Sequence, residues 1–299
     1  CRLLGLGNTG LVRYSVLEGL LESPDGDSIR SVNPKVWIIG VGHRTHWAVL
    51  LLTARHAARH SLILMKPSLP LSWFDRVILP RHDWPEDGLN ADGQIAAGQI
   101  ADGILLTEGV LNPLIDRRQH DSTQWLILIG GPSKRHGWDT AALNDQLRSL
   151  AQWLQTHAPN AIVTLSTSRR TPPEWLGMIQ ALPEFHYWQC LAVEETPPGW
   201  LAQALDRAGT VWVTEDSVSM ADEALTAGCQ VGLLGQPRLK ADRITRSMDR
   251  LIQEKRVQTL SCVQADLSGT TYTETPAPPL NEADRVARWL LAQPLGKCC

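Results

Sequence analysis

The sequence predicts an α/β protein with two Rossmann-like domains that face each other across a cleft. Short apolar runs alternate with longer amphipathic runs along nearly the whole chain. This alternation is typical of parallel sheets whose two faces are covered by helices. The chain has 299 residues, which is enough for two domains of ordinary size. Residues 112–123 are polar and lack an apolar period, and they predict the boundary between the domains.

The individual elements follow from the same periodicities. Short apolar runs predict strands at residues 2–4, 36–39, 61–65, 76–79, 104–107, 125–129, 161–165, 187–189, 211–213, 231–234 and 257–260. Amphipathic runs predict helices at residues 11–21, 46–59, 140–157, 173–181, 198–208, 218–227, 239–254 and 282–292. Residues 83–102 and 268–279 predict a surface loop and a linker. We therefore expect an N-terminal domain at 1–117, a C-terminal domain at 118–279, and a last helix within 280–299 that packs back on the N-terminal domain.

The composition is that of a globular protein with a real core, with 43% hydrophobic and 20% charged residues. The net charge of −3 provides no global basic field, so we expect no nucleic-acid partner. No apolar run reaches about 18 residues, and the N-terminus lacks a signal-peptide pattern. Six cysteines without CxxC or metal-ligand spacing predict reduced thiols in a cytoplasmic protein, with no metal and no cofactor. Peripheral membrane contact stays open, because scattered Trp and Arg side chains can provide it.

The segment 214–220 joins a predicted buried strand to a predicted helix. Ser217 and Ser219 lie at the start of the helix, where free backbone N–H groups and the positive end of the dipole favour an anion. Glu223 lies one turn further along the same helix face. This pattern suits a ligand with a phosphate at one end and a diol at the other. The alternative is ordinary helix capping by Asp216 or Ser217.

Two further loops of the second half carry polar and basic residues at strand ends. A Gly-Gly pair permits close backbone approach, and guanidinium or ammonium groups neutralise phosphate. The candidate ligand-binding residues of these loops are Gly131, Ser133 and Lys134 in the first, and Ser166, Ser168, Arg169 and Arg170 in the second. Together with Asp216, Ser217, Ser219 and Glu223 they predict a site for a phosphorylated ligand. The alternative for Arg169 and Arg170 is pairing with Glu215 and Asp216.

The first half carries a candidate general base. His43 follows a predicted strand and opens a predicted helix, and an unperturbed imidazole titrates near neutral pH. The spacing of His43 and His46 also occurs in metal sites, but no acid or cysteine stands nearby in sequence. The alternative is a surface histidine in a helix-capping loop. Arg44 belongs to the same segment.

Later loops of the first half add Lys66, Arg81 and His82 to the same prospective face. Lys66 and Arg81 would orient an anionic acceptor. The alternative for Arg81 is a surface pair with Asp83. Residues 5–10 match GxGxxG before a predicted helix, which is the dinucleotide-binding pattern. The acid that this pattern requires about 20 residues later is missing at the end of the next strand, so the match is incomplete.

Six motifs in order carry a family resemblance. They are GHRTH at 42–46, KPSLP at 66–70, PRHD at 80–83, GGPSK at 130–134, STSRRTP at 166–172 and TEDSVSM at 214–220. Over about residues 36–236 the sequence resembles the elongated-mitochondria, or mitochondrial fission, family and its bacterial relatives. The N-terminal glycine-rich segment departs from the usual pattern of that family.

The family is similar to GT-B glycosyltransferases, and this resemblance implies a function. It implies a nucleotide-diphospho-sugar donor held by the C-terminal domain, an acceptor of unknown identity on the N-terminal side, and no obligatory metal. By position, Glu223 would bind the ribose hydroxyls. The alternatives are a non-catalytic scaffold in processes such as organelle fission, and a nucleoside-diphosphate-sugar epimerase.

Overall fold

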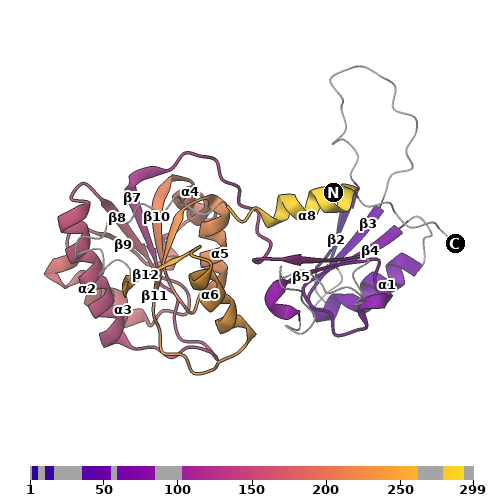
Figure 1. Ribbon diagram of the computed structural model, residues 1–299, viewed down its shortest axis with the longest axis horizontal. Helices are drawn as coiled ribbons and strands as arrows, with labels where there is room; N and C mark the ends of the chain where they lie inside the picture. Colours follow the sequence, from indigo (N-terminus) through magenta and orange to yellow (C-terminus); the bar gives the residue numbers. More distant parts are fainter. Residues whose placement is uncertain are drawn as a thin grey trace, which may run out of the picture. The chain divides into compact units, whose positions relative to one another are not determined.

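A computed structural model describes residues 2–5, 11–16, 36–54, 59–84, 103–261 and 279–292. The chain divides into two compact units (Figure 1). Unit 1 contains the described residues up to Gly109 together with those from Asp284 onward. Unit 2 is Val110–Ala283.

Unit 2 is built on a six-stranded sheet with the order β12-β11-β10-β7-β8-β9. All five neighbouring pairs are parallel. The strands are β7 (Asp121–Leu128), β8 (Ile162–Ser166), β9 (Gln189–Leu191), β10 (Ala208–Thr214), β11 (Gln230–Leu234) and β12 (Gln258–Thr259). Because parallel strands end at the same edge, the loops that follow them gather there.

Helices cover both faces of this sheet (Figure 1). The helices are α2 (Thr140–His157), α3 (Pro173–Gln180), α4 (Trp200–Arg207), α5 (Val218–Ala227) and α6 (Arg243–Gln253). Side chains of α2 and α3 form one buried cluster, and those of α4, α5 and α6 form the other. The alternation along β10 explains this division, because Val211 and Val213 enter one cluster and Trp212 enters the other. Gly232 lies beside Trp212 in the register, where a side chain would meet the indole ring.

Unit 1 contains a six-stranded sheet with the order β1-β2-β3-β4-β5-β6. The strands are β1 (Arg2–Gly5), β2 (Leu11–Val16), β3 (Val36–Val41), β4 (Arg59–Leu64), β5 (Arg76–Pro80) and β6 (Ile104–Thr107). Strands β3 to β6 are parallel. Helix α1 (His46–Ala54) packs its Val49 against this sheet, and α8 (Glu282–Ala292) places Trp289 beneath the Arg76 guanidinium at 5.8 Å.

The predicted helix at residues 11–21 is wrong over its first part. Strand β2 occupies residues 11–16 and pairs antiparallel with β1 and β3. The sequence LVRYSV alternates and contains β-branched and aromatic residues, which favours a strand over a helix. The dinucleotide-binding pattern needs a helix after its glycines, whereas the next element described after Gly5 is this strand. Residues 6–10 and 17–21 lie outside the described residues.

Elsewhere the expected elements are present with shifted ends. Helices α2, α5 and α8 have the predicted bounds. Helix α6 begins later than predicted because Asp242 caps it, with Oδ1 accepting from the Ile244 N–H at 2.9 Å. The predicted loop and linker at 83–102 and 268–279 lie almost entirely outside the described residues. Of the described cysteines, Cys190 and Cys229 are free thiols.

Candidate functional site

The N-terminal end of α5 is the first feature of the candidate site. Ser217 is the N-cap residue, but its side chain makes no capping hydrogen bond. The caps of α2 and α6 differ, because Asp139 and Asp242 both accept hydrogen bonds from first-turn N–H groups. The first-turn N–H groups of α5 therefore have no side-chain acceptor at the cap, and the positive end of the helix dipole is open to an anion.

Hydrogen bonds bring the three predicted polar loops of unit 2 together. The Gly130 N–H donates to Thr214 Oγ1 at 2.7 Å, and the Gly131 N–H donates to Asp216 Oδ2 at 3.0 Å. Arg170 forms an ion pair with Asp216 at 2.7 Å and donates to the Gly131 carbonyl at 2.8 Å. The loops after β7, β8 and β10 thus form one connected structure at the carboxyl edge of the sheet.

The contacts of the two acids in segment 214–220 show which basic residue each acid pairs with. Asp216, whose side chain is fully buried, pairs with Arg170, so this part of the alternative interpretation is confirmed. Glu215 pairs instead with Arg238, which also binds Asp249 at 2.7 Å. Arg238 lies in the loop after β11, and nothing in the local sequence pattern singled it out.

The two glycines after β7 allow this close packing. A side chain at Gly130 would meet the Asp216 carboxylate at 2.2 Å, and one at Gly131 would meet the Arg170 carbonyl at 2.2 Å. Both distances lie far below van der Waals contact. The glycines therefore serve the contact between loops, where the sequence suggested approach to a ligand.

A cleft of about 540 Å³ opens beside this structure, at the carboxyl ends of β7 and β8. Its polar lining comes from Ser166, Thr167, Ser168, Arg169, Arg170, Thr196, Ser217 and Ser219, and its apolar lining from Leu128, Val193, Trp200, Leu201 and Met220. Within the described part of the chain, no side chain pairs with the exposed Arg169. A free guanidinium, an open helix N-terminus and several hydroxyls together favour a phosphorylated or carboxylated ligand.

Some predicted ligand residues have structural roles or lie away from the cleft. Ser168 Oγ donates to the Gly130 carbonyl at 2.9 Å, and Ser133 Oγ accepts from the Arg135 and His136 N–H groups at 3.1 and 3.0 Å. Lys134 is exposed and does not line the cleft. Glu223 is half-buried, also outside the lining, and burial raises its pKa. Its role in binding ribose stays a prediction.

The middle of α5 holds a buried acid that sequence reasoning missed. Asp222 is 3% exposed, and its Oδ2 accepts from the Val110 N–H at 3.0 Å. Burial, helped by the nearby charges of Glu223 and Glu282, raises the Asp222 pKa to about 7, although the hydrogen bond from the Val110 N–H acts in the opposite direction. Val110 begins unit 2, so Asp222 anchors the segment by which the chain enters this unit.

In unit 1 the candidate base lies on the surface. His43 and Arg44 form a 3₁₀ turn (His43–Thr45) before α1, and both are exposed, as is Lys66 after β4. Within the described ranges none of the three has a hydrogen-bond or ion-pair partner. The groups are at the expected strand ends, but no contact holds them in a fixed geometry.

His46 is the buried member of the histidine pair. It is 1% exposed, its Nδ1 lies 3.3 Å from Ser68 Oγ, and its Nε2 has no partner among the described residues. Burial lowers the His46 pKa, and the nearby His43 lowers it further. Its three-residue spacing from the exposed His43 was visible in the sequence, but its burial was not.

Arg81 and His82 are partly buried and engaged in contacts. Arg81 pairs with Glu108, which follows β6, at 3.2 Å. His82 Nε2 lies 3.4 Å from Asp83 Oδ1. Arg81 therefore links the loops after β5 and β6, a partner that the sequence did not suggest.

The fold and the site define an α/β protein with a parallel sheet in unit 2, a mixed sheet in unit 1 whose strands β3 to β6 are parallel, and a ligand-sized cleft at the carboxyl edge of the unit 2 sheet. The expected α/β class is confirmed, whereas the facing arrangement of the domains stays a prediction. A sequence model of the family described as "Mitochondrial fission ELM1" matches residues 14–293. The chain belongs to this family, as the six motifs predicted. No curated protein matches the sequence.

Solved structures with similar folds include two GT-B glycosyltransferases. MurG from Acinetobacter baumannii has a TM-score of 0.40 and 14% identity over 85% of this chain and 64% of its own. The pneumococcal O-GlcNAc transferase GtfA, solved with UDP and GlcNAc, has a TM-score of 0.35 and 10% identity over 83% of this chain and 55% of its own. The chain thus spans less than two thirds of either enzyme. The cypemycin decarboxylase CypD has a TM-score of 0.31 and 11% identity over 46% of this chain and 82% of its own. At these TM-scores the similarities carry no functional argument.

No group of three or more His, Cys, Asp or Glu side chains in the described ranges is arranged to hold a metal ion. None of the described helices is long and apolar enough to cross a membrane. The predicted metal independence, cytoplasmic location and absence of a nucleic-acid partner stay predictions.

Proposed function

We propose that the protein is a GT-B-like glycosyltransferase whose unit 2 binds a nucleotide-diphospho-sugar. The observation that carries this proposal is the cleft in which the uncapped N-terminus of α5 and the free Arg169 lie together. The partial positive charge of this helix end and the full positive charge of Arg169 suit a diphosphate better than a neutral ligand. The volume of about 540 Å³ lies within the range of pockets that bind small molecules and cofactors.

The cleft offers a way to stabilise a departing diphosphate through protein groups. Donors aimed at developing negative charge lower the barrier of group transfer. The first-turn N–H groups of α5 and the Arg169 guanidinium are such donors, and the Ser219 hydroxyl lies beside them. Arg170 is already paired with Asp216, so its main role is to hold the loops in place. In this proposal, transfer proceeds without an obligatory metal.

The acceptor side is assigned to unit 1. His43 is the candidate base for an acceptor hydroxyl, with Arg44, Lys66, Arg81 and His82 around an anionic acceptor. A base usually needs a partner that orients it, and the described residues provide none for His43. That observation favours a second candidate function, in which the cleft binds a nucleotide ligand without turnover and the protein acts as a scaffold.

Calorimetric titration with UDP, GDP, ADP and pyrophosphate tests the binding step. We expect one nucleoside diphosphate to bind, and Arg169→Gln to weaken it about tenfold or more. Lys240→Gln is a matched control, because it removes one exposed positive charge outside the cleft. No binding of any nucleotide, or equal affinity in the Arg169 variant, would contradict the proposal.

Two further measurements separate ribose recognition and catalysis. If Glu223 binds ribose, Glu223→Gln weakens a nucleoside diphosphate but leaves pyrophosphate binding unchanged. Release of nucleoside diphosphate from the matching nucleotide sugar, with loss of turnover in His43→Ala, supports the transferase. Binding without turnover over a broad acceptor panel supports the scaffold.

A further inference from the structure

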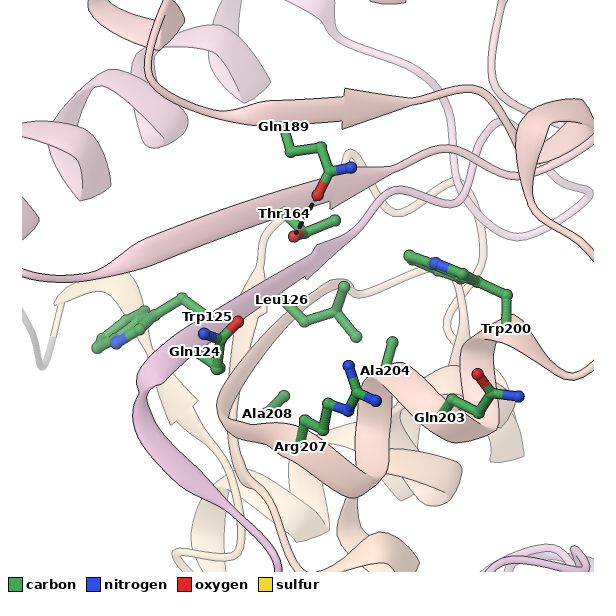
Figure 2. A pocket seen from close by; sticks show the side chains of 10 residues that line it. All are labelled: Gln124, Trp125, Leu126, Thr164, Gln189, Trp200, Gln203, Ala204, Arg207 and Ala208. Carbon is green, nitrogen blue, oxygen red and sulfur yellow. Dashed lines mark hydrogen bonds between the residues drawn. The ribbon is translucent and has the colours of Figure 1, made fainter.

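The sheet of unit 2 has a second hollow, on the face beside α4 (Figure 2). Parallel sheets are usually covered on both faces. Here α4 covers β10 and β7, but Ile162 on β8 is 55% exposed. We call the hollow the α4 groove; it is lined by Gln124, Trp125, Leu126, Thr164, Gln189, Trp200, Gln203, Ala204, Arg207 and Ala208.

The strand register builds the floor of the α4 groove. Leu126 pairs with Thr164, and Thr164 pairs with Gln189, so these three side chains form one row across β7, β8 and β9. Leu126 is buried and provides an apolar centre, while its two neighbours in the row are polar. The groove volume is about 230 Å³, below the usual range for drug-sized ligands, so it suits a single small ring.

The polar groups around this floor are open to a ligand. Figure 2 shows the amides of Gln124 and Gln189 and the guanidinium of Arg207 around Leu126. Gln189 Oε1 accepts from Thr164 Oγ1 at 3.5 Å, which leaves its NH₂ group free to donate. Within the described chain, the side chains of Gln124, Gln203 and Arg207 have no hydrogen-bond or ion-pair partner.

We propose that the α4 groove binds a saccharide unit that carries a carboxylate, as in a hexuronic acid. Each glutamine amide both donates and accepts, which matches sugar hydroxyls that do the same. The Arg207 guanidinium matches a carboxylate with two parallel hydrogen bonds. The Trp200 indole at the rim offers a flat apolar surface for the C–H face of a sugar ring.

The α4 groove is separate from the nucleotide cleft but adjoins it. Trp200 lines both hollows. Leu126 and Leu128 are alternate residues on the same face of β7, as are Thr164 and Ser166 on β8, so the two floors lie about 7 Å apart. This proposal does not depend on nucleotide binding, but Trp200 provides a reporter between the two sites.

The test is a titration of the full chain with glucuronate and with glucose, in which NMR signals of the tryptophan indole N–H groups are recorded at each step. The Trp200 signal is assigned with Trp200→Phe. We expect glucuronate to shift the Trp200 signal in a saturable manner, and glucose to bind about tenfold more weakly because it lacks the partner of Arg207. Arg207→Gln should abolish this preference, while Lys240→Gln should retain it.

The outcomes are distinguishable from those of the nucleotide experiments. Arg207→Gln should leave the nucleoside diphosphate affinity unchanged, and the melting curve of each variant shows whether it is folded. Equal affinity for glucuronate in the wild type and the Arg207 variant would overturn the proposal. So would the absence of saturable shifts, or binding of a β-strand peptide along the edge strand β9 in the absence of any saccharide binding.

Discussion

Helices α5 and α1 each follow a parallel strand at the carboxyl edge of their sheet, yet their beginnings differ. Helix α5 starts directly after the β10 loop, and no side chain occupies its cap. Helix α1 is preceded by a 3₁₀ turn in which Thr45 Oγ1 donates to the Gly42 carbonyl at 2.8 Å, and its first residue, His46, is buried. A strand-helix junction therefore offers its first-turn N–H groups to an anion only where the loop leaves the helix end open.

The two helices also bury titratable groups of opposite kind. Asp222 in α5 has a raised pKa, and His46 in α1 has a lowered pKa. Burial is the largest cause in both cases, and it disfavours the charged form of each group. Unit 2 should therefore lose stability as pH rises, and unit 1 as pH falls.

Replacing Asp222 should have the largest effect. The pKa of about 7 in the folded protein lies above the ordinary value of 3.8, so the stability from this group is complete below about pH 4 and is lost as pH rises through about 7. Asp222→Asn should stabilise unit 2 at pH 8 by up to about 4 kcal/mol, because each pKa unit corresponds to about 1.4 kcal/mol. Urea unfolding, monitored by hydrogen exchange of the β7 and β10 amides, measures the difference in stability between the variant and the wild type. A variant less stable than the wild type at pH 8 would show that the charged form is favoured.

Adding a methyl group should distinguish the two glycine-containing loops. Gly131→Ala places a methyl group against the Arg170 backbone carbonyl. We therefore expect the free energy of unfolding to fall by about 3 kcal/mol and nucleotide binding to be lost. The methyl group of Gly42→Ala would point into open space, and only the φ of 78° at this position is unfavourable. We therefore expect the free energy of unfolding to fall by only about 1 kcal/mol. Denaturant unfolding of both variants is the measurement. Equal losses would mean that the loops of unit 2 are not tightly interlocked.

Two carboxylates at strand ends provide the next comparison. Asp216→Ala removes the carboxylate that accepts from the Gly131 N–H and pairs with Arg170. The free energy of unfolding should therefore fall by about 2 kcal/mol. Glu108→Ala breaks the partly exposed pair with Arg81, which should cost less than about 1 kcal/mol. The same unfolding assay applies, and nucleotide titration shows whether the Asp216 variant also loses the cleft. A larger loss in the Glu108 variant would reverse the contrast between the units.

The pH response of His46 should be the smallest effect. Its lowered pKa contributes stability that is present above about pH 6.5 and is lost as pH falls through the folded value. His46→Phe should remove this acid sensitivity of unit 1 while filling a similar volume. Hydrogen exchange of β3 and β4 at pH 5 and pH 8 measures it. An unchanged acid response would assign it to another group.

Several parts of the fold and site could be predicted because their causes are local. The period of α2 and the Asp139 cap define that helix, and the alternation of elements places the polar loops at one edge of each sheet. The helix predicted at 11–21 was wrong over residues 11–16 because pairing with β1 and β3, together with the LVRYSV alternation, favours a strand. The pairing of Arg170 with Asp216 was one of the expected alternatives, but the partner of Glu215 could not be predicted, since Arg238 lies 23 residues away.

The sequence by itself determined the α/β class, the polar strand ends, the family and the presence of a helix after Val213. These follow from periodicity and motif order, which are properties of neighbouring residues. Only the tertiary structure decided that Arg170 holds the loops while Arg169 has no side-chain partner among the described residues, that Asp222 and His46 are buried, and that the α4 groove is open. Burial and pairing depend on residues from distant strands that meet at one sheet edge, and no local pattern records that meeting.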